Sequence, residues 1–182
     1  MRTLFTIHAG EYLVASHIEK QFKRVNVWLP SRDTGIDLLI SDRRSRKTLS
    51  LQVKFSKDFL VTDIGPEFQK QLRACGWWTI DRDKLRRSRA DYWVFVLLGF
   101  ASRTVDYVVI PPRQFWRRIR SIHGGKKRID TYLWVAEDDS CWETRGLDRA
   151  DQLRIADGRY THSSRNLTQW LNNWSAVTRL NS

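Results

Sequence analysis

The spacing of apolar and polar residues predicts a helix in the first part of the chain, followed by a strand. Within residues 10–23, Val14, Ile18 and Phe22 recur at every fourth position and form one apolar stripe on a helix. Residues 25–29 are predicted to form a strand that the following proline ends. We expect the stripe of the helix to pack against a sheet.

Two runs of alternating polarity predict a β-hairpin after this strand. The runs are residues 35–40 (GIDLLI) and 48–55 (TLSLQVKF), and the polar segment 41–47 lies between them. Turn-forming residues occupy positions 31–35, before the first run. The register of this hairpin decides which side chains share one face of the sheet.

Further runs predict a sheet with helices on its faces. Strands are expected at residues 90–100, 105–110 and 131–136, and helices at about residues 67–74, 83–89 and 113–122. A last amphipathic helix is expected from the helical spacing of Leu167, Trp170, Leu171, Trp174 and Val177. This order indicates an α/β fold with a mixed central sheet flanked by helices. Residues 1–182 are expected to form one domain, with a helical segment of about residues 150–182 packing on the core.

The composition indicates a folded core and a polyanionic partner. The chain of 182 residues is 41% hydrophobic and contains nine Trp, eight Phe and five Tyr, which is ample material for a core. Its net charge is +12 at pH 7, and such a surplus concentrates polyanions around the surface. Nucleic acid is therefore the first partner to consider, and an anionic membrane is the second.

Several classes of protein are disfavoured by the sequence. No stretch approaches the ~20 apolar residues that a membrane-spanning helix needs. His8 and Glu11 interrupt any apolar run of a signal peptide. The two cysteines, Cys75 and Cys141, fit neither a disulfide framework nor a zinc pattern. A cytoplasmic protein without a membrane role is expected.

The hairpin brings together three side chains that could carry chemistry. With a turn centred between Arg44 and Ser45, antiparallel pairing places Asp37 directly opposite Gln52, with Cβ atoms ~5 Å apart. Lys54 lies two residues beyond Gln52 and therefore shares its face, ~7 Å away on the diagonal. The same register gathers the apolar residues on the other face, so a slip of one residue would break both patterns.

Glu11 is expected to join this group from the first helix. It precedes Val14 and Ile18 by three and seven residues, so it extends the apolar stripe by one turn. A carboxylate on a face that packs against a sheet is costly unless it is paired or bound to a metal. The simpler alternative is an acid that the helix dipole favours at the N-terminus.

These residue types suit the hydrolysis of phosphodiester bonds with a hard cation. Mg²⁺ prefers oxygen ligands and commonly uses one or two carboxylates together with water and substrate. Glu11 and Asp37 would supply the carboxylates, and the Gln52 amide and the Val53 carbonyl would supply neutral oxygens. Lys54 would hold the attacking water or stabilise the charge that develops on phosphate. Mn²⁺ could replace Mg²⁺ in the same oxygen set.

The motif resembles the PD-(D/E)xK nuclease superfamily. Asp37 in a GID context, followed by Gln52-Val53-Lys54 on the next strand, is similar to the QxK variants among Holliday-junction-resolvase-like, Mrr-like and homing or restriction endonucleases. Glu11, just after Gly10, resembles the helical glutamate of those groups. The resemblance covers residues 8–57 well, and residues 90–110 only by strand order. Ile36 stands where the motif has proline, and Gln52 replaces the usual acid.

The resemblance implies both a fold and an activity. It implies a restriction-endonuclease-like core and a Mg²⁺-dependent endodeoxyribonuclease that acts on duplex or branched DNA and leaves a 5′-phosphate. One such site cuts one strand, so cutting both strands requires a homodimer or two visits. Two alternatives stay open: a non-catalytic basic module that binds nucleic acid, and an RNA-processing nuclease. In the structural alternative, Asp37 and Lys54 form only a surface ion pair worth ~0–1 kcal/mol.

Basic clusters are the candidate contacts with nucleic acid. Arginine predominates in them, and its planar guanidinium suits phosphate recognition. The candidates in four clusters are Arg43, Arg44, Arg46, Lys47, Arg86, Arg87, Arg117, Arg118, Lys126, Lys127 and Arg128. A solvated charged surface is the alternative for any single cluster. Trp77 and Trp78 are expected to pack in the core, the alternative being stacking on splayed bases.

Overall fold

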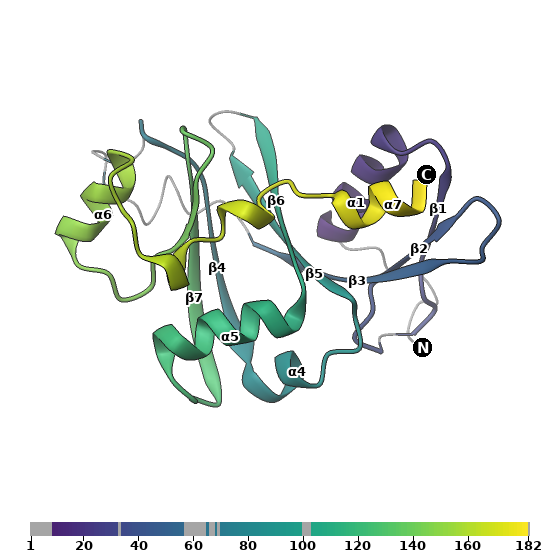
Figure 1. The fold of residues 1–182 in the computed structure, drawn as a ribbon, viewed down its shortest axis with the longest axis horizontal. Coiled ribbons are helices and arrows are strands. Elements are labelled where there is room, and N and C mark those ends of the chain that lie inside the picture. The colour runs from purple at the N-terminus through teal and green to yellow at the C-terminus, as the bar shows by residue number, and fades with distance from the viewer. Residues whose placement is uncertain are drawn as a thin grey trace.

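Two β-sheets form the centre of the protein, and helices pack against both of them (Figure 1). The computed structural model describes residues 9–32, 34–56, 65, 68, 70–99 and 103–181. Within these residues one sheet has five strands in the order β1-β2-β3-β5-β6, and the other has three in the order β4-β7-β8. The prediction of an α/β fold is therefore confirmed.

The five-stranded sheet contains the predicted hairpin. Its strands are β1 (Val25–Trp28), β2 (Leu38–Asp42), β3 (Thr48–Phe55), β5 (Tyr92–Gly99) and β6 (Thr104–Ile110). β3 and β5 are parallel, and every other neighbouring pair is antiparallel, so the sheet is mixed as expected. Because a parallel pair needs a crossover connection, the chain leaves this sheet after β3 and forms the first strand of the second sheet before it returns.

The second sheet begins with a strand where the sequence had indicated a helix. It consists of β4 (Leu72–Asp81), β7 (Arg128–Ala136) and β8 (Cys141–Glu143), all antiparallel. The prediction of a helix at residues 67–74 is wrong for residues 72–74, which belong to β4, whereas Glu67 lies outside the described residues. Alternation along β4 buries Trp78 but leaves Trp77 40% exposed, so the expected burial of Trp77 is also wrong. The Trp77 ring instead stacks on Tyr132 of β7.

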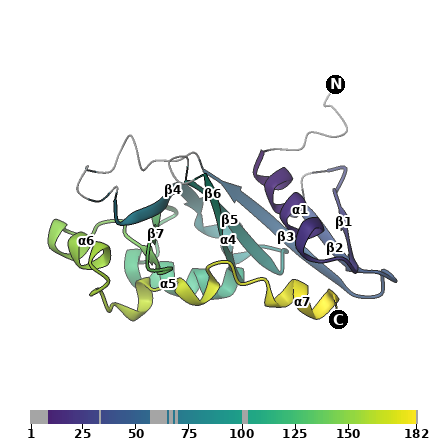
Figure 2. The same cartoon turned by 90° about the horizontal axis from the view of Figure 1, so that it is seen from above.

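Within the described residues, five α-helices pack around the two sheets. They are α1 (Ala9–Gln21), α4 (Arg82–Arg86), α5 (Pro112–His123), α6 (Arg149–Ala156) and α7 (Ser175–Asn181). Two views agree that α1 and α7 lie at one end of the molecule, on the five-stranded sheet, and α6 lies at the other (Figure 1, Figure 2). No helix in the described part of the chain is long and apolar enough to cross a membrane.

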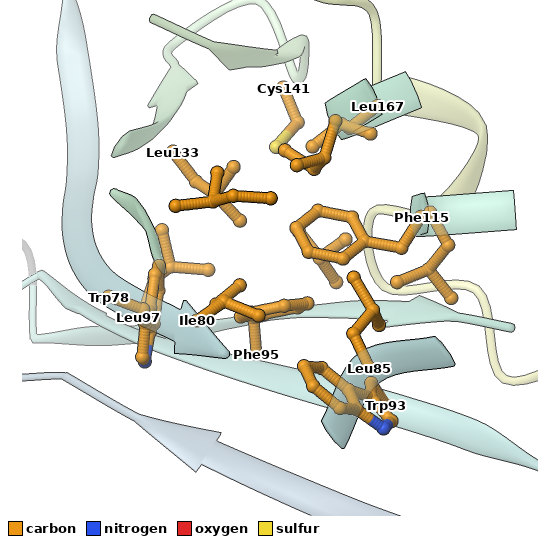
Figure 3. Close-up of a cluster of buried hydrophobic side chains, with 14 of the residues drawn as sticks. Trp78, Ile80, Leu85, Trp93, Phe95, Leu97, Phe115, Leu133, Cys141 and Leu167 are labelled. Atoms are coloured by element: carbon orange, nitrogen blue, oxygen red, sulfur yellow. The ribbon is translucent and has the colours of Figure 1, made fainter. Parts of the chain in front are cut away.

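The largest apolar cluster lies between the two sheets and under α5. Phe95 of β5 and Phe115 of α5 meet there with ring centroids 4.8 Å apart (Figure 3). A second cluster joins Val14 and Ile18 of α1 to the opposite face of the five-stranded sheet, as the apolar stripe of the helix predicts. The five-stranded sheet is therefore buried on both faces, which explains the nearly continuous apolar sequence of β5.

The C-terminal segment is not the single amphipathic helix that the sequence indicated. It contains the short 3-10 helices η1 (Ser163–Arg165) and η2 (Thr168–Trp170), and α7 follows them. Leu167 packs in the cluster between the sheets, whereas Trp174 and Val177 pack in the cluster under α1. Leu171 forms an isolated bridge with Val108 between them. One straight helix cannot place its stripe in both clusters, so the helical spacing misled the prediction.

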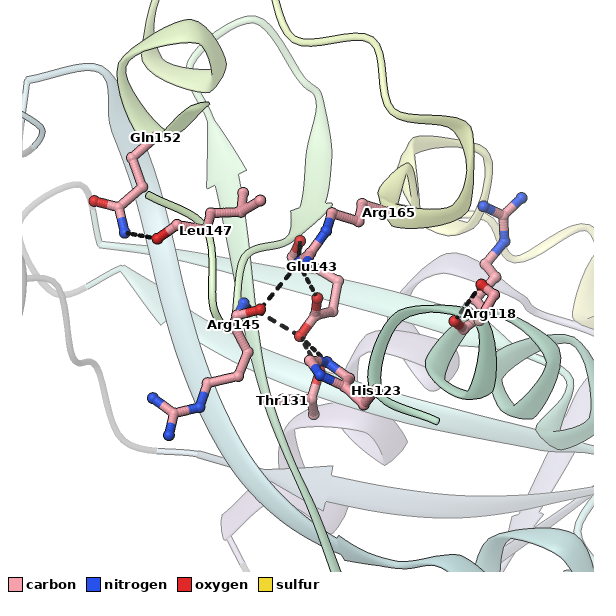
Figure 4. A network of polar contacts seen from close by, with 9 residues as sticks. Arg118, His123, Thr131, Glu143, Arg145, Leu147, Gln152 and Arg165 are labelled. Carbon is pink, nitrogen blue, oxygen red and sulfur yellow. Dashed lines mark hydrogen bonds and ion pairs between the residues drawn. The ribbon is translucent and has the colours of Figure 1, made fainter. Parts of the chain in front are cut away.

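A buried carboxylate ties α5, the second sheet and η1 together. Glu143 of β8 is 1% exposed, and its Oε2 accepts a hydrogen bond from Nη1 of Arg165 at 2.6 Å (Figure 4). Its Oε1 lies 2.9 Å from Nε2 of His123 and also accepts from the hydroxyl of Thr131 and the backbone N–H of Arg145. A buried charge with this many partners is stable only while the set stays complete.

Replacing Arg165 by alanine is expected to lower the free energy of unfolding by about 3 kcal/mol, because it leaves the buried Glu143 carboxylate without its cation. Arg159→Ala serves as the control, since Arg159 pairs with Asp157 on the surface and should contribute less than about 1 kcal/mol. Urea unfolding of both variants measures the difference. Equal stability of the two variants would contradict a structural role for the Glu143 network.

Candidate active site

The β2–β3 hairpin has the register that the sequence predicted. Its paired residues are Leu38 with Leu51, Leu39 with Ser50, Ile40 with Leu49 and Ser41 with Thr48. The turn is centred between Arg44 and Ser45, and Ser45 takes a positive φ of 53° there. The carboxylate of Asp42 braces the turn by accepting hydrogen bonds from the backbone N–H groups of Arg46 and Lys47. The ladder ends at Leu38 and Leu51, so the predicted position of Asp37 directly opposite Gln52 lies one residue beyond the paired strands.

Asp37 lies where the β2–β3 ladder ends, and its carboxylate accepts a hydrogen bond that a backbone carbonyl would otherwise accept. The N–H of Val53 donates to Oδ2 of Asp37 at 2.6 Å, and the N–H of Asp37 donates to the carbonyl of Leu51 at 2.8 Å. A continued ladder would have offered Val53 a backbone carbonyl from Ile36 instead. These two bonds hold the Asp37 carboxylate against β3, beside the residues that follow Leu51.

Gln52 and Lys54 share one face of β3 with the aromatic residues of β5. Gln52 pairs with Trp93 and Lys54 with Phe95 in the parallel register. The Lys54 ammonium lies 4.9 Å from the centroid of the Trp93 ring, which is a cation–π contact. Nε1 of Trp93 in turn donates to the Ser88 hydroxyl at 2.8 Å, which fixes the plane of the ring. The cation is therefore positioned by a rigid support rather than by its flexible stem alone.

A close approach of α1 to β3 brings Glu11 into the same neighbourhood. A Cβ atom on Gly10 would lie 2.6 Å from Cβ of Phe55 and 3.2 Å from Cγ1 of Val53. Such distances show that no larger residue fits between the start of α1 and β3. Because Glu11 follows Gly10 at this contact, its backbone lies beside the strand that carries Gln52 and Lys54.

All five residues proposed for the site line one cavity of about 780 Å³. These residues are Glu11, Asp37, Gln52, Val53 and Lys54, and they come from α1, the residue before β2, and β3. Cationic side chains from the β1–β2 loop and the α4 region line the same cavity, namely Arg32, Lys84, Arg87 and Arg89. The structure therefore brings together acids, a carboxamide and an amine within a basic rim.

Two further carboxylates line the cavity and were missed by the sequence analysis. Asp81 caps α4, because its Oδ1 accepts from the backbone N–H groups of Asp83 and Lys84. Asp83 accepts from Nε of Arg82 at 3.1 Å, and this hydrogen bond holds the pKa of Asp83 below its ordinary value. An aspartate before a basic helical run signals an N-cap, but nothing in the sequence relates it to the hairpin.

The donor set fits a hard divalent cation of the Mg²⁺ type. Glu11 and Asp37 offer carboxylate oxygens and Gln52 offers an amide oxygen, which are the ligand types that Mg²⁺ prefers. Among the residues described, no group of three or more His, Cys, Asp or Glu side chains could hold a metal ion. A site of two carboxylates and one carboxamide falls outside that pattern, and it would leave water and phosphate to supply the remaining ligands of an ion.

The candidate phosphate contacts lie in separate places. Arg43, Arg44, Arg46 and Lys47 are exposed at the hairpin tip, at the opposite end of β3 from Lys54. Arg87 lines the large cavity, and Arg86 lines a second cavity beside it. Contacts of the hairpin tip with nucleic acid stay a prediction.

The third basic cluster lies on α5, and the fourth extends from the turn after α5 to the start of β7. Arg117, Lys126, Lys127 and Arg128 are exposed. Arg118 differs, because its guanidinium lies 4.6 Å from the centroid of Trp170 and donates to the carbonyl of Ser163. Burial lowers the pKa of Arg118. Arg118 therefore helps attach the C-terminal segment to α5.

Comparison with known proteins gives no relative from which a function could be transferred. No protein-family model, no curated protein and no solved structure matches the chain. The functional assignment therefore depends on the chemistry and placement of the side chains in the cavity.

Replacing Gly10 by alanine is expected to destabilise the protein by about 1–3 kcal/mol, because the added methyl group forces α1 away from Phe55. The sign of this change in stability is informative, because alanine in place of glycine stabilises an ordinary helix by about 1 kcal/mol. Glu19→Ala, at an exposed position of the same helix, should change stability by less than about 0.5 kcal/mol. A Gly10→Ala protein that unfolds at higher urea concentration than the parent would disprove the close contact.

Proposed function

We propose that this protein is a metal-dependent endonuclease that hydrolyses phosphodiester bonds in DNA. The observation that carries the proposal is the presence of Glu11, Asp37, Gln52 and Lys54 on one cavity. Membership of the PD-(D/E)xK superfamily and a restriction-endonuclease-like core belong to the same proposal, supported by the GID motif directly before β2 and the QVK motif on β3.

The basic rim of the cavity supports a polyanionic substrate. Arg32, Lys84, Arg87 and Arg89 line the cavity together with its carboxylates, and the whole chain has a net charge of +12. Such a field attracts a phosphate backbone over a distance of about 10 Å at moderate salt. Glu11 and Asp37 alone would repel that backbone, so the substrate's approach depends on the surrounding cations and on the metal.

Glu11, Asp37 and Gln52 would hold Mg²⁺, with the Val53 carbonyl as a further oxygen donor. When bound, the ion neutralises charge on the phosphate and lowers the pKa of a coordinated water. The Val53 N–H keeps the Asp37 carboxylate oriented through Oδ2. A neutral Gln52 makes the cage less negative than a third acid would, so the metal is expected to bind more tightly once phosphate is present.

Lys54 is the residue that distinguishes a hydrolytic site from a simple metal site. Its ammonium, supported by the Trp93 ring, would donate hydrogen bonds to the attacking water or to the phosphate oxygens as charge develops on them. In the overall reaction, water adds to phosphorus and the bond to the 3′-oxygen breaks. The phosphate keeps the hydroxyl of the water, and the leaving 3′-oxygen receives its proton. Cutting both strands would require a second copy of the site.

The second candidate function is a non-catalytic module that binds nucleic acid, and Gln52 is the residue that favours it. A carboxamide in place of an acid reduces the negative charge that holds a divalent cation. This candidate predicts tight, salt-sensitive binding without cleavage, because phosphate contacts alone produce that behaviour. RNA in place of DNA is tested in the same assay.

The parent protein is expected to nick supercoiled plasmid with Mg²⁺ or Mn²⁺ and to lose this activity in EDTA. Lys54→Ala should lower the rate about 10²–10³-fold, because it removes a donor aimed at developing charge. Gel electrophoresis of plasmid, of branched and nicked duplexes, and of a structured RNA measures the rates.

Lys20→Ala is the matched control, since Lys20 is an exposed lysine near the other end of α1. It should cut as fast as the parent. Binding without metal-dependent cleavage by parent and variant alike would replace the enzyme by the non-catalytic module. Faster cleavage of RNA than of DNA would change the substrate class.

A further inference from the structure

A second, smaller cavity lies between α4 and α5 and is lined almost entirely by arginines and one tryptophan. Its volume is about 300 Å³, and its lining residues are Arg82, Arg86, Trp116, Arg120 and Gly125. The large cavity is lined by Asp81, Asp83 and Lys84 of the α4 region. The two cavities therefore lie beside the same five-residue helix, and a ligand that crosses α4 would reach both.

The charge of the small cavity indicates an anionic ligand. Of its three arginines, Arg82 pairs with Asp83 at 3.1 Å and donates to the carbonyl of Gly125 at 2.8 Å. Arg86 and Arg120 form no ion pair with any residue that the structure describes. Like charges that share a small cavity repel one another, and an anion between them removes that cost. Planar guanidinium groups suit phosphate in particular, because they donate two parallel hydrogen bonds.

Trp116 adds an aromatic surface beside these cations. Its ring is only partly buried, because it packs against the cluster between the sheets on one side and lines the cavity on the other. A base can stack on such a ring, and every base has a face that allows it. A cavity of about 300 Å³ is at the lower limit for small-molecule sites. It therefore suits one nucleotide and excludes a duplex.

We propose that this cavity binds one nucleotide of a single-stranded flank, with its phosphate on Arg86 and Arg120 and its base on Trp116. The inference rests on the proposed function, because it names a part of the substrate that the large cavity would cut. A helix with its side chains is about 10–12 Å wide, and a strand that keeps the stacking of duplex DNA advances about 3.4 Å per nucleotide. The bound nucleotide is thus about three nucleotides from the cleaved bond, and the preferred substrate is a duplex with a single-stranded branch.

The test measures binding of fluorescent duplexes that carry thymidine flanks of zero to six nucleotides, at either the 5′ or the 3′ end, in EDTA. With one flank polarity, affinity should rise about tenfold when the flank reaches about three nucleotides. Arg86→Ala with Arg120→Ala should abolish this gain and make the slope of log affinity against log salt shallower by about 0.7. Trp116→Ala should lose most of the gain, and Trp116→Phe should keep it.

Arg154→Ala with Arg159→Ala is the control, since it removes the same charge from exposed positions on and after α6. This variant should retain the gain from the flank. Thermal unfolding of every variant shows whether Trp116→Ala is folded. If Trp116→Ala does not fold, the Trp116→Phe variant and the double arginine variant still decide the test. Equal affinity for all flank lengths, or an unchanged gain in the arginine variant, would overturn the proposal.

The plasmid assay separates this proposal from the endonuclease. Cleavage by the parent without any gain from a flank disproves the nucleotide site and leaves the enzyme. A gain from the flank without cleavage disproves the enzyme and supports the nucleotide site as part of a binding module.

Discussion

The antiparallel pairing of β2 with β3 is the constraint on which the site depends. Side chains alternate between the two faces of a sheet, so this register alone decides that Gln52 and Lys54 face the cavity while Leu51 faces the core under α1. The hydrogen bond from the Val53 N–H to the Asp37 carboxylate completes the arrangement at the end of the ladder. A shift of the register by one residue would turn Gln52 and Lys54 toward the core and Leu51 toward the cavity. Folding and the proposed chemistry therefore require the same strand pairing.

Packing on both faces of the five-stranded sheet holds the side chains of the candidate site in place. On one face, the missing side chain of Gly10 lets α1 approach Phe55 and places Glu11 at the cavity. On the other face, the cluster between the sheets holds the Trp93 ring, and this ring supports the Lys54 ammonium. The second sheet therefore serves the candidate site indirectly, because it covers the face of the five-stranded sheet from which Lys54 extends. Its crossover also delivers α4, whose basic residues line both cavities.

The sequence predicted the part of the fold in which local pattern and tertiary burial agree. The stripe on α1 followed from helical spacing, and the limits of β3 and the register of the hairpin followed from alternation around a short turn. Prediction failed where one segment serves two environments. Leu167 and Val177 share a helical spacing but pack in different clusters, and residues 72–74, whose polarity suggested a helix, belong to β4. The α4 carboxylates could not be assigned to the cavity, because only the crossover between the sheets brings them to the hairpin.

Titration of the ¹⁵N-labelled protein with Mn²⁺ tests the central claim most directly, because a bound paramagnetic ion broadens the amide signals nearest to it. The account predicts that the amides of Glu11, Asp37 and Val53 broaden first, at substoichiometric Mn²⁺, and that Asp37→Asn removes the effect. Broadening that begins instead at the exposed carboxylates around Asp138, or that persists unchanged in Asp37→Asn, would contradict a divalent cation site on the paired strands.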